Sequence, residues 1–167
     1  MSRVLKPTML ILAAAALLTG AASAADRAPA MVLINESPSL PKGVYTRLPR
    51  ADVQAGSIVA VAQPASAQSY LQGLGMPGRV LLLKRVAATG GERVCARGRS
   101  VETPRRRVEA RTRDGRGVAL KPWSGCRTLR TDELFLLGDT AASYDSRYFG
   151  PVTVSDVTGV YRLVLSW

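Results

Sequence analysis

The sequence predicts a mainly β fold with few short helices. After its N-terminal segment the chain contains short apolar or β-branched runs bounded by Gly, Pro or Asp, which is the pattern of strands. No amphipathic segment of four helical turns occurs. Hydrophobic residues make up 47% of the 167 residues, so one compact core is expected.

Five runs are expected to be strands. They are MVLI (31–34), SIVAVA (57–62), RVLLLKRV (79–86), ELFLLG (133–138) and VYRLVLSW (160–167). The segment SAQSYLQGLGMPG (66–78) is interrupted by glycines and predicts a short helix or a flap over a site. Alternation on both sides of Asp114–Gly115 predicts a type I′ hairpin.

The N-terminal segment has the three parts of a secretory signal peptide. They are a positive start with Arg3 and Lys6, the apolar run TMLILAAAALL (8–18), and the small residues Ala22-Ser23-Ala24. We therefore expect a signal peptide over residues 1–24 and an exported domain over residues 25–167. The alternative is an uncleaved membrane anchor, although the apolar run is shorter than the roughly 20 residues that span a bilayer.

Composition restricts the chemistry more than it restricts the partner. The formal charge of +11 suits nucleic acid, an anionic membrane surface or a solvated basic face. The chain has no histidine, which excludes Ser-His-Asp and Cys-His catalysis and removes the commonest zinc ligand. The base of a hydrolase would have to be a desolvated lysine or a carboxyl group of raised pKa, and we expect no metal.

The two cysteines, Cys95 and Cys126, enclose an arginine-rich segment. In an exported protein an oxidising compartment lets them pair, so a structural disulfide is expected. The alternatives are a free catalytic thiol, which lacks a histidine or any thiolate-stabilising neighbour except arginines, and a metal site, which two cysteines alone support poorly.

A first candidate for catalysis lies in NESPSLPKGVY (35–45), where serines stand among prolines and a glycine that restrict the backbone. Pro38 favours an extended conformation at Ser37, whereas Ser39 retains both its hydroxyl and its amide proton. Such a turn could present Ser39 to a substrate. The alternative is a proline-rich surface turn in which the serines have no chemical role.

A second candidate is Lys84, inside the apolar run RVLLLKRV. Alternation places its side chain on the face of Leu82 and of Val80 or Val86, with Arg85 on the other face. Desolvation there would lower the lysine pKa and make the neutral amine available as a general base. The alternative is a lysine on an edge strand whose ammonium reaches solvent.

Three ordered motifs resemble those of a known family. They are Ser39, Pro41, Gly43 and Tyr45 in Ser-x-Pro-x-Gly-x-Tyr, then Lys84-Arg85-Val86, then GDTAASYDSRYFGPV (138–152). In this order they resemble the boxes of the type I signal peptidases, which are serine–lysine endopeptidases, and more narrowly those of the conjugative-transfer peptidase TraF branch. The resemblance implies a coiled, barrel-like antiparallel β-sheet body in which an extended substrate adds a strand.

The resemblance also implies roles for the motif residues. Ser39 would be the nucleophile and Lys84 the general base. The Ser39 amide and the Ser37 hydroxyl would stabilise the oxyanion. Ser143 would hydrogen-bond and orient the lysine amine.

The last motif implies a buried ion pair between Asp145 and Arg147 beside the site. A carboxylate in contact with Lys84 would raise the lysine pKa, so we expect Asp145 nearer to Arg147. The chain departs from housekeeping signal peptidases after the nucleophile, where Ser-Leu-Pro replaces Ser-Met-x-Pro. This tighter turn resembles the TraF branch and argues against broad preprotein processing.

The function implied by the resemblance is cleavage of an exported precursor after small residues. For the TraF branch the precursor is a conjugative pilin, which is either hydrolysed or closed into a ring. Ile34, Leu40 and Val44 would suit small apolar side chains before the cut. The implied location is the periplasm at the inner-membrane surface, with conjugation or type IV secretion components as partners, no nucleic acid and no cofactor.

Two other functions stay open from the sequence. One is a catalytically inactive peptidase-like scaffold. The other is a basic exported binding module of a secretion or conjugation apparatus that docks on anionic lipid or nucleic acid through RRRVEARTRDGR (105–116). Aromatic residues for base stacking are scarce, at 5% of the chain.

Overall fold

The computed structural model describes residues 29–167, and Met31–Trp167 form one compact unit. The expected signal peptide or anchor over residues 1–24 lies outside the described residues. Within residues 29–167, no helix is long and apolar enough to cross a membrane.

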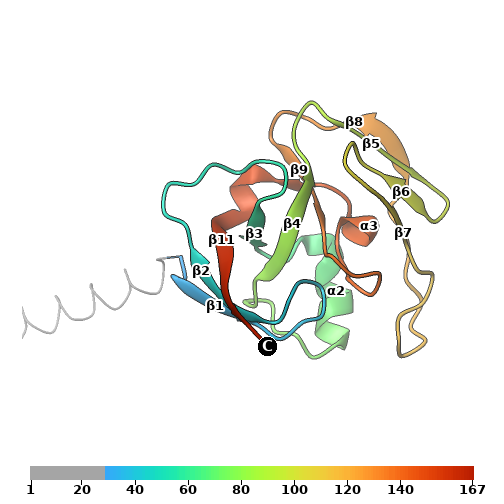
Figure 1. Ribbon diagram of the computed structural model, residues 1–167. Coiled ribbons are helices and arrows are strands. Elements are labelled where there is room, and N and C mark those ends of the chain that lie inside the picture. Colours follow the sequence, from blue (N-terminus) through green and yellow to red (C-terminus); the bar gives the residue numbers. More distant parts are fainter. Residues whose placement is uncertain (1–28) are drawn as a thin grey trace, which may run out of the picture. The chain divides into compact units, whose positions relative to one another are not determined.

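Two antiparallel sheets build the body (Figure 1). The larger sheet has the order β1-β2-β11-β3-β4-β9-β10, and the smaller sheet has the order β7-β6-β5-β8. The strands of the larger sheet are β1 (Val32–Asn35), β2 (Gly43–Arg47), β3 (Ile58–Val61), β4 (Leu82–Ala88), β9 (Glu133–Leu137), β10 (Val152–Thr153) and β11 (Val157–Ser166). Those of the smaller sheet are β5 (Arg93–Arg97), β6 (Ser100–Glu102), β7 (Arg107–Glu109) and β8 (Gly125–Thr128).

The predicted fold class is confirmed, and each of the five expected strand runs overlaps an observed strand. Short helical elements complete the body: α2 (Ala65–Gly73), α3 (Ser146–Phe149) and the 3-10 turn η1 (Val154–Asp156). The glycine-interrupted segment therefore contains a short helix, which buries Ala67 and Leu71. Asp145 caps α3 by accepting a hydrogen bond from the Arg147 amide.

The loop around Asp114 differs from the predicted type I′ hairpin. That turn requires positive φ at both central residues, but neither Asp114 nor Gly115 has a positive φ, whereas Gly117 has φ 83°. The Asp114 carboxylate accepts hydrogen bonds from the amides of Arg116 at 2.9 Å and Val118 at 2.8 Å. These bonds close a wider loop than two residues could form.

The interior position of β4 in its sheet decides the environment of the candidate lysine. This strand pairs with β3 on one side and with β9 on the other. Lys84 lies opposite Val59, and the strand is buried along nearly all of its length. Lys84 is therefore an interior residue and not a lysine on an edge strand.

Apolar side chains from both sheets stabilise this arrangement. Burial of each large one contributes about 2 kcal/mol. One cluster packs under β3, β4 and α2 and includes Val59, Val61, Leu71, Val86, Leu134 and Leu136. A second cluster joins the smaller sheet to β4 and β9 and includes Ala88, Val94, Val101, Phe135 and Leu137.

Candidate active site

The turn that carries Ser39 connects β1 to β2 and is organised by the buried side chain of Asn35. The Asn35 amide nitrogen donates to the carbonyls of Ser37 at 2.9 Å, Leu40 at 3.1 Å and Pro41 at 3.1 Å. Its amide oxygen accepts from the Ser37 amide at 3.2 Å. One side chain thus bonds to four backbone groups of the turn.

A role for Asn35 was not predicted from the sequence. The available signal was its place at the end of a strand, immediately before a serine-rich turn, because asparagine side chains commonly bond to nearby backbone groups. The buried Tyr45 adds a hydrogen bond of 2.7 Å from its hydroxyl to the Pro41 carbonyl. The turn is therefore held from both of its ends.

Ser39 and Lys84 meet inside the body. The Lys84 Nζ donates a hydrogen bond of 3.1 Å to the Ser39 Oγ. Both residues are almost inaccessible to solvent, with 3% of Ser39 and 5% of Lys84 exposed. The structure thus brings together the two residues proposed from the sequence, although they lie 45 positions apart.

Burial changes the protonation of the Lys84 amine. It lowers the lysine pKa from 10.5 to about 8, while the nearby Asp145 charge raises it and the Arg147 charge lowers it by smaller amounts. About a tenth of the amine is therefore neutral at pH 7. A neutral amine in contact with a hydroxyl can accept its proton.

Ser37 also contacts the candidate nucleophile. Its hydroxyl donates to the Ser39 Oγ at 2.9 Å and accepts from the Ser39 amide at 3.1 Å. The two expected oxyanion donors therefore lie side by side and are bonded to each other. A substrate carbonyl would have to replace these contacts.

The ion pair expected in the last motif is present. The Arg147 guanidinium donates to the Asp145 carboxylate at 2.8 Å and 2.6 Å, and both side chains are buried. The carboxylate also accepts from the amides of Arg147 at 3.1 Å and Gly138 at 2.8 Å. Asp145 therefore lies against Arg147, as predicted, and both charges act on Lys84.

The expected hydrogen bond between Ser143 and the Lys84 amine is absent from the structure. Within residues 29–167 the Ser143 Oγ is buried and has no hydrogen-bond partner. The Lys84 amine bonds to Ser39 instead, and the Ser143 side chain packs against Gly138. On another side Ser143 lines a small pocket together with Tyr70, Tyr144 and Tyr148.

Gly138 and Asp139 connect the last motif to the nucleophile turn, and the sequence analysis gave neither of them a role. The Asp139 amide donates to the Ser39 carbonyl at 2.6 Å. A Cβ on Gly138 would collide with Ser143 and lie 2.8 Å from the Ser39 carbonyl oxygen, so this close approach requires glycine. The Asp139 carboxylate binds Arg85 at 3.0 Å and 2.8 Å.

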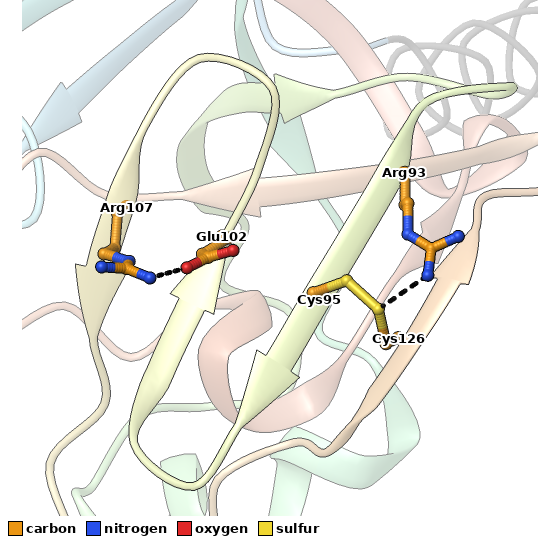
Figure 2. The surroundings of a disulfide bond; sticks show 5 residues. All are labelled: Arg93, Cys95, Glu102, Arg107 and Cys126. Atoms are coloured by element: carbon orange, nitrogen blue, oxygen red, sulfur yellow. Dashed lines mark hydrogen bonds and ion pairs between the residues drawn. A yellow bond between two sulfur atoms is a disulfide. The ribbon is translucent and has the colours of Figure 1, made fainter.

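The disulfide lies apart from these contacts, in the smaller sheet. Cys95 of β5 faces Cys126 of β8 and the two are joined, as predicted (Figure 2). The neighbouring Arg93 donates to the Cys126 sulfur at 3.3 Å. Both cysteines are thus structural, and neither acts as a free thiol.

The structure thus places a buried serine hydroxyl against a buried lysine amine on a β scaffold, an arrangement in which an amine can act as a base toward a nucleophile. The profile of the family described as signal peptidase, peptidase S26, matches residues 2–167. The chain therefore belongs to this family.

Relatives of this chain that are named TraF indicate one branch of that family. A probable conjugal transfer protein TraF from Sinorhizobium fredii (strain NBRC 101917 / NGR234) is 35% identical over 80% of this chain and 77% of the relative. A plasmid transfer protein TraF from Escherichia coli is 32% identical over 92% of this chain and 91% of the relative. The resemblance to the TraF branch is thus confirmed.

A solved structure with similarity to this chain is that of a signal peptidase I from Enterococcus faecalis V583. It is 23% identical, with a TM-score of 0.40, and the match covers 66% of this chain and 97% of that chain.

Proposed function

We propose that this protein is a serine endopeptidase in which Ser39 is the nucleophile and Lys84 is the general base. The observation that carries the proposal is the 3.1 Å hydrogen bond between the buried Lys84 Nζ and the Ser39 Oγ. The lowered lysine pKa, about 8, supports it because a neutral amine is then populated near neutral pH.

In the first half-reaction the Ser39 Oγ attacks the scissile carbonyl while the Lys84 amine takes the hydroxyl proton. The oxyanion that forms accepts hydrogen bonds from the Ser39 amide and the Ser37 hydroxyl. The lysine ammonium then gives its proton to the leaving amine, which completes the acyl-enzyme. Water, or an amine of the precursor, attacks this ester and loses a proton to Lys84; the ammonium returns the proton to the Ser39 oxygen as the ester bond breaks and the hydrolysed or cyclised product leaves.

The substrate we propose is an exported precursor cut after small residues, such as a conjugative pilin. The relatives named as conjugal or plasmid transfer proteins support a role in conjugation.

The test uses an internally quenched peptide with alanine at P1 and P3, followed by mass spectrometry of a pilin precursor from a conjugative system. Ser39→Ala and Lys84→Met are each expected to lower kcat/KM by at least about a thousandfold, because the dyad residues act as a unit. The exposed Ser124→Ala and Lys121→Met are the matched controls and should cleave like the parent protein. Cleavage that survives in either dyad variant, with both folded, rejects the mechanism, and an inert parent protein favours the scaffold.

The binding-module alternative is weakened by the pairing of the arginines in its basic segment. Arg105 binds Glu92 at 2.7 Å, and Arg107 binds Glu102. Local acids thus neutralise part of the charge that nucleic acid would have to contact.

We also propose that the body associates with the inner-membrane surface on the periplasmic side. Large apolar side chains are exposed on β1 and β11, the strands on either side of β2, or next to them; they are Met31, Val32, Ile34, Val164, Leu165 and Trp167. Such a patch is unusual on a soluble surface. Ile34→Ser with Leu165→Ser should reduce sedimentation of the protein with phosphatidylglycerol-containing vesicles, whereas the exposed Val118→Ser should not; equal sedimentation of both would reject the proposal.

A further inference from the structure

Three consecutive arginines, Arg105, Arg106 and Arg107, each have a different acidic partner. Arg105 binds Glu92, and Arg107 binds Glu102 within the smaller sheet; the second pair is drawn in Figure 2. Arg106 points elsewhere, to the segment that follows β9. Its guanidinium donates to the Gly138 carbonyl at 3.3 Å and lies 3.7 Å from the Asp139 carboxylate.

The turn between β6 and β7 fixes the backbone of Arg106. The Thr103 amide donates to the Arg106 carbonyl at 2.9 Å. The Thr103 hydroxyl donates to the same carbonyl at 3.0 Å and accepts from the Arg106 amide at 3.2 Å. Arg106 is half-buried between two exposed arginines, so its direction is set by the turn and not by free rotation at the surface.

The segment that Arg106 contacts is bonded to both halves of the candidate site. The Asp139 amide holds the Ser39 carbonyl at 2.6 Å. The Asp139 carboxylate binds Arg85, the residue after the candidate base. The Gly138 amide bonds to Asp145 at 2.8 Å. A shift of this segment would therefore move the nucleophile turn relative to β4.

We propose that Arg106 is a positioning residue that links the smaller sheet to the active site and holds Gly138 and Asp139 where they keep Ser39 in register with Lys84. The proposal rests on the proposed function. Arg106 does not touch the reacting atoms, and it acts through the carbonyl of Gly138 and the carboxylate of Asp139.

The linkage matters because proton transfer depends steeply on the distance between the Ser39 Oγ and the Lys84 Nζ, and small misplacements lower catalytic rates strongly. Without Arg106 the Asp139 carboxylate keeps its ion pair with Arg85 but loses the second guanidinium, and the Gly138 carbonyl loses the hydrogen bond from Arg106. The planar guanidinium of Arg106 contacts both acceptors through separate nitrogens, in a fixed geometry that a lysine ammonium does not provide.

The experiment compares Arg106→Gln with the matched controls Arg105→Gln and Arg107→Gln in the full chain, using the quenched peptide. Arg106→Gln is expected to lower kcat about fivefold, which corresponds to about 1 kcal/mol, with KM within about twofold of the parent value. Both controls should retain the parent kcat. Arg106→Lys should restore part of the loss, because it keeps the charge but not the two-acceptor geometry.

Amide hydrogen exchange provides a readout that a general loss of stability would not reproduce, and the pH profile serves as the control for an unchanged Lys84 environment. The charges that shift the Lys84 pKa are Asp145 and Arg147, so the midpoint of the kcat profile should stay unchanged in Arg106→Gln. Exchange of the Asp139 amide, which donates to the Ser39 carbonyl, should accelerate in Arg106→Gln and not in Arg105→Gln.

The outcomes separate this inference from the proposed function. If the parent protein cleaves, Ser39→Ala does not, and Arg106→Gln matches Arg105→Gln in kcat, the positioning role is wrong while the peptidase stands. If the parent protein is inert, the proposed function fails, and the Asp139 exchange rate then decides whether Arg106 holds the segment. Unchanged exchange in Arg106→Gln overturns the inference in either case.

Discussion

Replacing Lys84 by methionine should abolish cleavage and at the same time stabilise the folded protein at neutral pH. The buried amine has its pKa lowered from 10.5 to about 8. A lysine that is protonated in the unfolded chain at pH 7 must therefore be desolvated on folding, which opposes folding by about 3 kcal/mol. Loss of the hydrogen bond to Ser39 offsets about 1 kcal/mol of the gain, so we expect Lys84→Met to be about 2 kcal/mol more stable.

The difference in the free energy of unfolding between Lys84→Met and the parent protein changes sign with pH. Below pH 8 both states of the parent protein are protonated, and the full penalty applies. Between pH 8 and the unfolded value of 10.5 the folded state releases its proton first, so the parent gains about 1.4 kcal/mol of stability per pH unit relative to the variant. Above that range the penalty is absent, and the parent should be the more stable protein by its hydrogen bond to Ser39.

Urea unfolding with the disulfide intact, at several pH values from 6 to 11, measures this difference directly. Lys121→Met is the control, because that lysine is exposed and its replacement removes no buried amine. Its stability relative to the parent should be nearly flat with pH. A Lys84→Met variant that is less stable than the parent at pH 7, or a difference that does not change with pH, would refute the assignment of Lys84 as a desolvated amine.

Three further predictions concern the site and its support. The kcat/KM of the parent protein should rise about tenfold per pH unit below pH 8 and level off above it, because the neutral Lys84 amine is the reactive form; a profile that falls with rising pH contradicts this. Asn35→Ala should lower the free energy of unfolding by about 2 kcal/mol and slow peptide cleavage, since it leaves buried carbonyls of the turn unpaired. Unchanged stability and unchanged cleavage would show that the turn keeps its conformation without the Asn35 side chain. Cys95→Ser with Cys126→Ser should lower the free energy of unfolding by about 3 kcal/mol, because the bridge closes a loop across 31 positions. The folded fraction should cleave at the parent rate, because the bridge lies outside the dyad. Free thiols in the unreduced, unfolded parent protein would exclude the bridge.

Much of the candidate site was predictable because its signals are local in the chain. Lys84 stands out as an ionisable residue in an apolar run, and Ser39 stands out among residues that restrict the backbone. The structure places both as expected and also pairs Asp145 with Arg147.

The departures concern which groups form hydrogen bonds, because the residue pattern does not specify these partners. Ser143 was expected to bond to the lysine amine, but the amine bonds to Ser39 and Ser143 packs against Gly138. The hairpin at Asp114 failed because the aspartate side chain, and not a second residue of positive φ, closes the loop.

The sequence by itself determined the mainly β class, the buried character of β4 and the identity of the residues that could form a nucleophile and a base, because periodicity and backbone restriction are properties of neighbouring residues. Only the tertiary structure decided which groups face one another. In the structure the Asp139 amide bonds to the Ser39 carbonyl, and Arg106, unlike the arginines on either side of it, contacts the segment that contains Asp139. Any of these arginines could pair with any of these acids as far as their chemistry is concerned. Only the packing of the two sheets decides which pairs form.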